Sequence, residues 1–383
     1  MKKLLIGLLL GTAAAACRAA LGETTTLWQN GACGIAVYRI PALCTAPNGD
    51  LVAACDARTN HGGDLCFHQP INISIRRSKD GGKTWTDPKN SWTWEWKQGG
   101  SRWSGSDPSF VVDAQEKKIF LFYNVWEWQQ VEANARAAGD KNLQNRSHGV
   151  YRFFVQESSD NGATWTKPRE ISKDIAIEGW PCGSEEGKGG FIFISSGSGI
   201  QTKDGTLLHT IVHVNDGNAL FGSDDHGKTW KPFGKPVKNG DECKVVELSD
   251  GAWMINSRWR GGGRQIHVSK DRGMTWQSRY DKSLEDPQCN AQIMRYGKFL
   301  LFTNCKSPNR RALLHIRASL DDGQTWTEGV RLLPPDGPEG SGYSDMTILP
   351  NGDIGVLYEG PNYATIKFVT IPRNEAVAEL FTK

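Results

Sequence analysis

Hydrophobic residues occur along this 383-residue chain in short runs that glycine-rich polar segments separate. Ile71–Arg76, Phe153–Gln156 and Gln265–Val268 are such runs, and a polar turn follows each of them. Helical periodicity is confined to residues 127–147, where alanine and valine recur at helical spacing and predict a short helical insertion. The pattern therefore predicts an all-β protein of many short strands joined by tight turns.

One eight-residue pattern, Ser-x-Asp-x-Gly-x-Thr-Trp, occurs five times and punctuates these runs. The copies are Ser78–Trp85, Ser158–Trp165, Ser223–Trp230, Ser269–Trp276 and Ser319–Trp326. The aspartate side chain accepts hydrogen bonds from N–H groups of a turn, and the glycine supplies a positive φ without steric cost. Each copy therefore predicts a hairpin tip, with its tryptophan packed over the turn, between the third and fourth strands of a propeller blade.

Two further regions supply strands outside the five repeats. Residues 24–56 and 343–370 each contain strand-like runs around an Asn-Gly-Asp turn, at Asn48–Asp50 and Asn351–Asp353. Strands from the two ends of the chain that share a blade would close a ring. We therefore predict a single six-bladed β-propeller over residues 24–375.

One repeat also matches a nucleotide-binding pattern. Gly222–Thr229 fits G-x-x-x-x-G-K-[ST], but a P-loop has to open a helix whose N-terminus faces phosphate. Trp230, Pro232, Gly234 and Pro236 follow directly and exclude that helix. Because four sister segments share the pattern of a turn, we interpret this segment as a hairpin tip as well.

Composition and charge narrow the class of protein further. The 43 glycines and 15 tryptophans suit a turn-rich β fold. A net charge of +3, from 45 basic and 42 acidic residues, gives no reason to expect nucleic acid or an anionic membrane as partner. It does not exclude a basic pocket for a small anion.

The N-terminus has the features of an export signal over about residues 1–20. Lys2 and Lys3 precede the apolar run Leu4–Leu10, and small residues follow at Ala13–Ala16. The run is too short to span a bilayer. We expect an exported protein, either periplasmic, secreted or on the outer surface, with a lipid anchor at Cys17 as the alternative.

Nine cysteines bear on the redox state. Eight remain beyond the signal, which is an even number for an oxidising compartment. Cys44 and Cys55 flank one turn and Cys289 and Cys305 flank another, so each pair is a candidate disulfide. Free buried thiols are the equally weighted alternative.

Metal-ligand spacings are lacking. His61, Cys66 and His68 cluster without a known ligand spacing, and His209 and His213 have no glutamate of a zinc helix beside them. We expect neither a metal nor an organic cofactor.

The segment Tyr38-Arg39-Ile40-Pro41, followed by five repeats, resembles the bacterial exo-sialidases of glycoside hydrolase family 33, whose structural Asp boxes the repeats resemble. The resemblance covers about residues 25–370. It implies a six-bladed propeller that removes terminal sialic acid from sialylated glycans, with no cofactor, no nucleic acid and no membrane span. A non-catalytic sialic-acid-binding propeller and a trans-sialidase are the alternatives.

By this resemblance, three arginines bind the carboxylate of sialic acid. They are Arg39, Arg258 in Asn256–Arg258, and Arg311, for which the neighbouring Arg310 remains the alternative. Guanidinium groups suit this task because they bind carboxylates with two parallel hydrogen bonds and stay charged.

The resemblance also assigns the chemistry. Tyr343 resembles the nucleophile, Glu242 its base and Asp64 the acid/base, with Glu247 as a rival of Glu242. A neutral phenol avoids the repulsion that a carboxylate nucleophile would meet at an anomeric carbon bearing a carboxylate, but with a pKa of about 10 it needs a base. Asp64 would protonate the leaving oxygen and then activate water.

Three further residues match supporting positions of the family. Arg58 and Asp107 resemble residues near the O4 and acetamido side of the sugar, and Glu359 resembles the carboxylate that orients Arg39. Cys243 departs from the asparagine that is common there. The tryptophans at 92, 94, 96, 103, 126 and 128 match no motif, and we favour packing over sugar binding for most of them.

Overall fold

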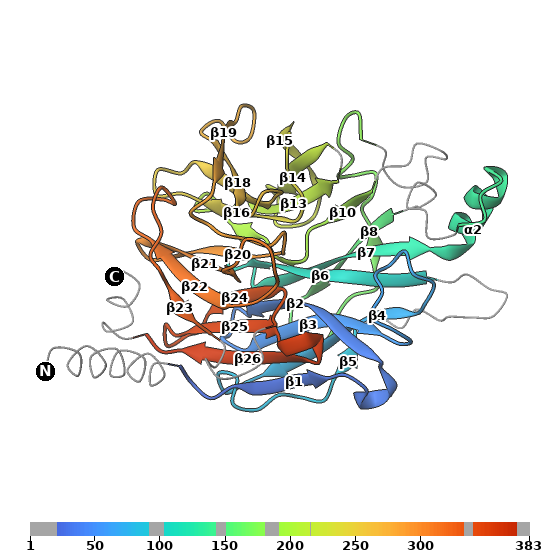
Figure 1. The fold of residues 1–383 in the computed structure, drawn as a ribbon, viewed down its shortest axis with the longest axis horizontal. Helices are drawn as coiled ribbons and strands as arrows, with labels where there is room; N and C mark the ends of the chain where they lie inside the picture. The colour runs from blue at the N-terminus through green and yellow to red at the C-terminus, as the bar shows by residue number, and fades with distance from the viewer. Residues whose placement is uncertain are drawn as a thin grey trace, which may run out of the picture.

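The computed structural model describes residues 21–91, 103–142, 151–180, 191–214, 216–332 and 340–373. Its strands form six sheets that follow one another in chain order around a ring (Figure 1). All strand pairs are antiparallel except a short parallel pair at one sheet edge. The predicted all-β, six-bladed propeller is confirmed.

The first three sheets contain the N-terminal half of the ring. The first sheet consists of β2 (Val37–Thr45), β3 (Leu51–Arg58), β4 (Ile71–Ser78) and β5 (Lys89–Asn90). The second sheet consists of β11 (Gly197–Ser198), β6 (Trp103–Asp113), β7 (Lys118–Glu127), β8 (Tyr151–Ser158) and β9 (Arg169–Glu170). The third sheet consists of β10 (Ile192–Ile194), β12 (Ile200–Gln201), β13 (Leu207–His213), β14 (Gly217–Ser223) and β15 (Lys231–Val237).

The remaining three sheets complete the ring. The fourth consists of β16 (Cys243–Glu247), β17 (Trp253–Arg258), β18 (Arg264–Ser269) and β19 (Gln277–Asp281). The fifth consists of β20 (Gln292–Tyr296), β21 (Phe299–Cys305), β22 (Leu314–Ser319) and β23 (Val330–Arg331). The sixth consists of β24 (Ser344–Ile348), β25 (Ile354–Glu359), β26 (Thr365–Ile371) and β1 (Thr25–Gln29).

The sixth sheet joins the two ends of the chain. Thr25 of β1 pairs with Phe368 of β26, so the first strand completes a blade whose other three strands come last (Figure 1). The shared blade predicted from the two Asn-Gly-Asp regions is therefore present. Because β1 pairs with β26, the first and last strands of the chain are both paired within one blade.

The first strands of the sheets lie around the axis of the ring. β2 packs against β6 and β24, and β20 packs against β16 and β24. Strands alternate in direction within each antiparallel sheet, so the first strand begins at the same end of the ring at which the second strand ends. The connection between the third and fourth strands then lies at the opposite end.

The five repeats form hairpin turns of one geometry. In the first, Ser78 Oγ donates to Asp80 Oδ1 at 2.8 Å, Gly82 N donates to Ser78 Oγ at 2.8 Å, and Thr84 Oγ1 donates to Asp80 Oδ2 at 2.6 Å. The other four copies reproduce these contacts at 2.7–2.8, 2.8 and 2.6 Å. Each turn connects the third and fourth strands of a sheet, as predicted, and the P-loop-like copy is no exception.

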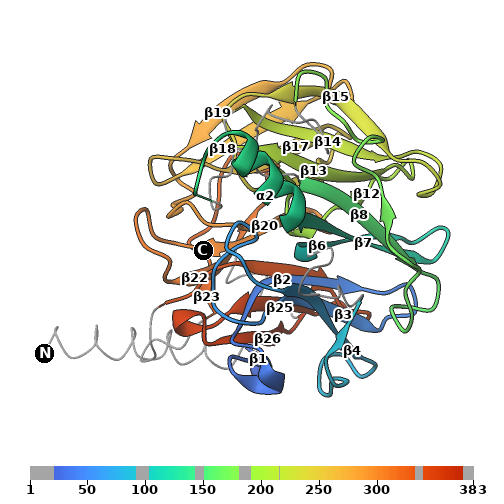
Figure 2. The same cartoon turned by 90° about the vertical axis from the view of Figure 1, so that its right-hand side faces the viewer.

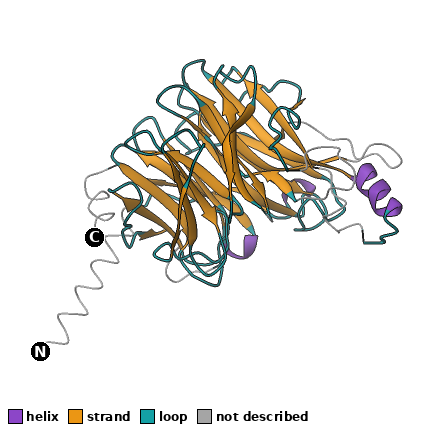
Figure 3. Cartoon of the chain, turned by 90° about the horizontal axis from the view of Figure 1, so that it is seen from above, coloured by secondary structure: helices purple, strands orange, loops and turns teal. Residues whose placement is uncertain are grey.

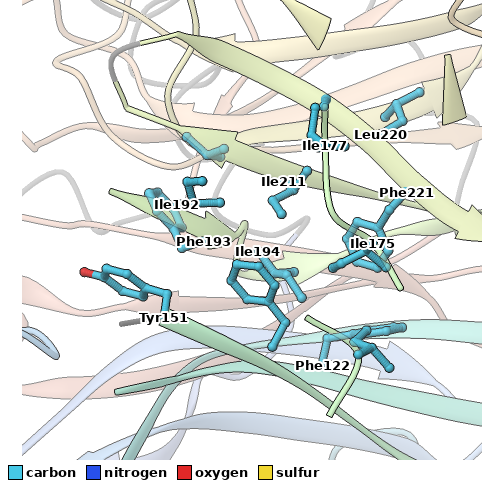
Figure 4. Packing of buried hydrophobic residues seen from close by; sticks show 14 of the residues in the cluster. Phe122, Tyr151, Ile175, Ile177, Ile192, Phe193, Ile194, Ile211, Leu220 and Phe221 are labelled. Carbon is cyan, nitrogen blue, oxygen red and sulfur yellow. The ribbon is translucent and has the colours of Figure 1, made fainter. Parts of the chain in front are cut away.

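Apolar side chains between neighbouring sheets form the core. Between the second and third sheets, Phe122, His209, Phe221 and Trp230 contact one another edge to face or stacked, with ring centroids 4.8–6.3 Å apart. Figure 4 shows Phe122 and Phe221 in this layer, with Ile211 among the surrounding aliphatic side chains. Such edge-to-face aromatic packing holds adjacent blades together.

The helical insertion is present but shorter than its predicted range. α2 (Trp128–Ala137) projects from one end of the molecule (Figures 1 and 3) and faces the viewer in Figure 2. Trp128, Val131 and Ala135 are its buried residues. Trp126 and Trp128 are fully buried, which agrees with a packing role, whereas tryptophans 92, 94 and 96 lie outside the described residues. No helix in the described ranges has both the length and the apolar character needed to cross a bilayer.

Neither candidate pair of cysteines forms a disulfide. Cys44 lies opposite Val52 of β3 and Cys55 lies opposite Ser74 of β4, and both are free thiols. Cys289 and Cys305 are free thiols as well, and all four are buried, which is the alternative that the sequence left open. The segment 1–20, predicted as an export signal, lies outside the described residues.

Candidate active site

A cavity of about 220 Å³ opens at one end of the ring. Seven of the nine predicted site residues line it: Arg39, Asp64, Asp107, Glu242, Arg258, Arg311 and Tyr343. The other two, Arg58 and Glu359, are fully buried and contact these residues from behind. The structure thus brings the whole predicted set, drawn from across the ring, to one place.

Strand direction explains this convergence. Glu242 directly precedes β16 and Tyr343 directly precedes β24, which are the first strands of their sheets. Arg258 and Glu359 are the last residues of the second strands, β17 and β25. First strands begin and second strands end at the same end of the ring, so all four residues are delivered to the cavity.

Tyr343 and Glu242 are joined directly by a hydrogen bond inside the cavity. The Tyr343 hydroxyl donates to Glu242 Oε2 at 2.6 Å, and Arg258 Nη1 donates to the same oxygen at 2.6 Å. Burial, followed by the charge of Glu242, raises the pKa of Tyr343 well above its ordinary value. The phenol is therefore neutral at physiological pH, with a carboxylate in place to accept its proton.

Glu359 fixes both Arg39 and the backbone of the nucleophile candidate. Arg39 Nε donates to Glu359 Oε1 at 2.5 Å, and Ile40 N donates to the same oxygen at 3.0 Å. The other carboxylate oxygen accepts from Tyr343 N at 2.8 Å. The ring of Tyr363 lies 4.3 Å from the Arg39 guanidinium carbon. One buried carboxylate thus links β2 to the start of β24.

Arg311, not Arg310, lines the cavity. Its guanidinium carbon lies 5.4 Å from the centre of the Tyr343 ring, and its nitrogens donate to Tyr363 Oη at 3.5 Å and Gln288 O at 3.2 Å. Within the described part of the chain, Arg311 makes no ion pair with a carboxylate. Its charge therefore remains available to an anionic ligand.

Asp64 lies at the rim of the cavity on a loop anchored from below. Arg58, 1% exposed, is held by Asp56 Oδ2 at 2.9 Å and donates to Asp64 Oδ1 at 2.8 Å. The Asp64 side chain itself is 57% exposed. The insertion supports the same loop, because His68 packs against Trp128 of α2 with ring centroids 4.7 Å apart. Asp64 is thus both tethered and open to a substrate.

Two residues that line this cavity have a backbone at positive φ. Ile40 has φ 61° and Asp107 has φ 60°, and each stands before a proline inside a β-bulge of a first strand. A β-branched residue at positive φ is a genuine outlier, and bulges re-aim the neighbouring side chains. The bulges separate Arg39 and Asp107 from the regular alternation of their strands. Burial, then the charges of Asp56 and Glu242, raises the pKa of Asp107 well above its ordinary value.

The sequence did not identify several residues that complete the site. Asp56 and Asp241 contact Arg58 and Arg258, and the ring of Tyr363 covers Arg39. An apolar wall consists of Leu65, Tyr151, Phe191, Phe193 and Val214. No motif marks the wall, since its members come from four separate segments. The position of Asp56 two residues before Arg58 was the one available signal.

The choice between Glu242 and Glu247 is resolved by position. Glu247 is the last residue of β16 and lines a second cavity, of about 490 Å³, at the opposite end of that strand from Glu242. Across the described ranges, no group of three or more histidine, cysteine, aspartate or glutamate side chains is arranged to hold a metal ion. His209 is buried among aromatic rings, and burial lowers its pKa to about 3.

Comparison with known proteins agrees with the geometry. A sialidase from Micromonospora viridifaciens is 38% identical over 354 residues, which cover 86% of this chain and 51% of that protein. A sialidase from Bacteroides fragilis is 30% identical over 342 residues, covering 85% of this chain and 60% of that protein. The chain thus spans between half and two thirds of the length of these relatives.

The solved structure of a Hadza microbial sialidase superimposes with a TM-score of 0.76 at 27% identity, covering 91% of this chain and 68% of that one. These relatives confirm the resemblance to sialidases. The model of the BNR repeat-like domain matches residues 49–356. The chain therefore belongs to the family of proteins with a BNR repeat-like domain.

Proposed function

We propose that this protein is an exo-α-sialidase, a glycoside hydrolase that releases terminal sialic acid and retains the anomeric configuration. The observation that carries the proposal is the contact of 2.6 Å between the Tyr343 hydroxyl and Glu242, beside the cationic groups of three arginines. That combination suits a sugar that carries a carboxylate on its anomeric carbon. The sialidase relatives support the same substrate class.

Substrate binding would use the three guanidinium groups together. Arg39 is oriented by Glu359 and Arg258 by Glu242, so two of the three are fixed before any ligand arrives. Arg311 adds a cation that has no carboxylate partner among the described residues. Preorganised bidentate donors hold a carboxylate with little reorganisation, which places the anomeric carbon near Tyr343.

The chemical step would be a double displacement by the catalytic pair, Tyr343 and Glu242. The Tyr343 oxygen forms a bond to the anomeric carbon as the glycosidic C–O bond breaks, and its phenolic proton passes to Glu242. Asp64 gives its proton to the departing oxygen. In the second half, Asp64 takes a proton from water, the water oxygen bonds to the anomeric carbon, and Tyr343 leaves with the proton that Glu242 held.

A turnover assay with defined products tests the proposal. Purified protein should release sialic acid from an aryl α-sialoside and from sialyl-oligosaccharides, and proton NMR should show the α-anomer first. A β-anomer as first product would contradict the retaining mechanism. Transfer of sialic acid to an added galactoside, in preference to water, would instead identify the trans-sialidase alternative. Absence of turnover on every sialoside would leave only the binding propeller.

A further inference from the structure

A second layer of charged side chains lies directly beneath the catalytic pair. Lys244 follows Glu242 by two residues on β16, and Asp345 follows Tyr343 by two residues on β24. Side chains two residues apart on a strand point to the same side. The two strands therefore carry matched pairs, with Tyr343 and Glu242 in the cavity and Asp345 and Lys244 one level deeper along the axis.

Asp345 joins the first strands of several blades. It is fully buried and accepts hydrogen bonds from Leu43 N of β2 at 2.8 Å, Ser198 Oγ of β11 at 2.8 Å and Gln292 Nε2 of β20 at 2.6 Å. Ser198, Gln292 and Leu43 also line the cavity of about 490 Å³ that opens on the far side. The Asp345 carboxylate is thus the centre of a partition between that cavity and the site.

Lys244 extends the partition to the fourth blade. Lys244 is 1% exposed. Its ammonium group donates to Asn290 Oδ1 at 2.8 Å, and Asn290 Nδ2 donates to Ser196 Oγ at 2.7 Å. A Cβ placed on Gly197 would lie 2.9 Å from Lys244 Cε and 3.5 Å from the Asp345 carboxyl carbon. Gly197, with φ 100°, is therefore the residue that lets the chain pass between the two charged groups.

The burial of two opposite charges, on Lys244 and Asp345, requires an explanation. Removing an ammonium or carboxylate from water is costly unless hydrogen bonds and an opposite charge offset the loss, and a well-packed apolar pair serves stability equally well. A buried ionic group is therefore a candidate for holding neighbouring side chains in position. Tyr343 and Glu242 are such neighbours, because each lies two residues before one of the two buried charges.

We propose that Lys244 and Asp345 are positioning residues that hold the starts of β16 and β24 at the spacing at which Tyr343 reaches Glu242, and that the Lys244 cation attracts the Glu242 carboxylate. The proposal rests on the function proposed above and adds to it a second layer of residues that do not contact the substrate. Neither residue touches the substrate cavity. Their effect on turnover passes through the catalytic pair.

Ionisation of Lys244 makes the layer sensitive to pH. Burial lowers the pKa of Lys244 to about 8, although the facing carboxylates of Asp345 and Glu242 and the thiol of Cys243 act to raise it. Arg264 is the facing cation and lowers the pKa further. The ammonium charge is thus present below about pH 8 and is lost above it. An arginine at this position would keep its charge throughout.

The test compares Lys244→Met and Lys244→Arg with the wild type on an aryl sialoside from pH 5 to pH 10. Methionine keeps the length of the side chain and removes the charge, so kcat should fall about tenfold while KM changes less than about twofold. Its kcat profile should also lack the alkaline limb that the wild type shows near pH 8. Lys244→Arg should recover most of kcat and carry its plateau to higher pH.

The same change at an exposed position, Lys203→Met, serves as the matched control and should leave kcat, KM and the profile unchanged. If Lys244→Met lowers the melting temperature but keeps the wild-type kcat and alkaline limb, the role is structural alone and the proposal is overturned. Should that variant not fold, Asn290→Ala removes the Lys244 acceptor and leaves both charges; an unchanged kcat there overturns it too. An inactive wild type would overturn the proposed function itself and the layer's role with it.

Discussion

The five repeat turns and the candidate active site are built in opposite ways at opposite ends of one ring. In each turn, the serine, aspartate, glycine and threonine that hold it lie within six residues of one another, and the contacts recur almost unchanged. In the site, Tyr343 reaches Glu242 across 101 residues and Arg39 reaches Glu359 across 320. The turns are therefore local and redundant, whereas these two site contacts depend on the closed ring.

The turns and the site also differ in their contributions to the free energy of folding. A repeat turn satisfies its own polar groups, so loss of one copy should affect stability by the modest net value of a few hydrogen bonds. The site holds buried charges and, at Ile40, a β-branched residue at positive φ, and both cost free energy and persist because the surrounding sheets fix them. We expect changes in the turns to affect stability, and changes in the site to affect turnover.

Tyr343→Phe should break the function and spare the fold. The variant keeps the ring in its apolar surroundings beside Ile40 and Cys289 and removes the hydroxyl that donates to Glu242. Because the proposed nucleophile is lost, kcat/KM on an aryl sialoside should fall by at least about 10³-fold. Thermal unfolding should stay close to that of the wild type, since Arg258 still pairs with Glu242. Turnover within tenfold of the wild type would remove Tyr343 from the chemistry.

Asp64→Ala should show a loss that depends on the leaving group. The side chain is exposed at the rim, so its removal leaves the core unchanged. A general acid contributes most when the departing oxygen is a poor leaving group, so sialyl-oligosaccharides should lose about 10²-fold or more in kcat/KM. An activated aryl sialoside should lose much less. Equal losses on both substrates would contradict the acid role.

This difference between near and distant contacts also explains what could be predicted from the sequence. The turn at Ser158–Trp165 is visible because its chemistry and its spacing lie in eight consecutive residues. The shared last blade was predictable from the two Asn-Gly-Asp regions, and the helical insertion from periodicity. These features depend on local conformation, which the sequence pattern reports directly.

The site was predictable only through resemblance, and only in part. Arg39 and Tyr343 stand in motifs, yet nothing in the sequence states that they meet, because a ring closure lies between them. The choice of Arg311 over Arg310 depends on which side chain faces the cavity, and the sequence alone does not distinguish two adjacent arginines. The apolar wall and Tyr363 match no motif, because their place at the cavity also depends on the folded ring.

Arg311→Lys should sharpen the assignment of the third arginine. Lysine keeps the charge but loses the planar pair of donors, so KM should rise about tenfold with kcat within about threefold of the wild type. Arg310→Lys, the same change one residue away and outside the cavity, is the matched control and should leave KM unchanged. A larger effect at Arg310 than at Arg311 would reverse the assignment.

Asp160→Asn, in a repeat turn, should have the smallest effect and the opposite character. The turn loses charge-assisted bonds from Thr164 N and Thr164 Oγ1, which lie at 2.9 and 2.6 Å, so unfolding free energy should fall by about 1 kcal/mol, limited by solvent screening, while kcat and KM stay unchanged. A change in kcat would contradict the expectation that the turns affect stability and not turnover.

The pH dependence of Asp160→Asn tests the cause of that effect. Hydrogen bonds from Thr164 and Ser158 lower the pKa of Asp160 to about 2 against the opposing effect of desolvation, whereas the unfolded chain should keep the usual value of about 3.9. Since the unfolded state binds more protons between these values, the stability that this carboxylate contributes is present above about pH 4 and is lost as pH falls toward 2. The gap in melting temperature between the wild type and Asp160→Asn should therefore narrow over that interval. A gap that stays constant from pH 6 to pH 2 would mean that the turn depends on the shape of the side chain and not on its charge.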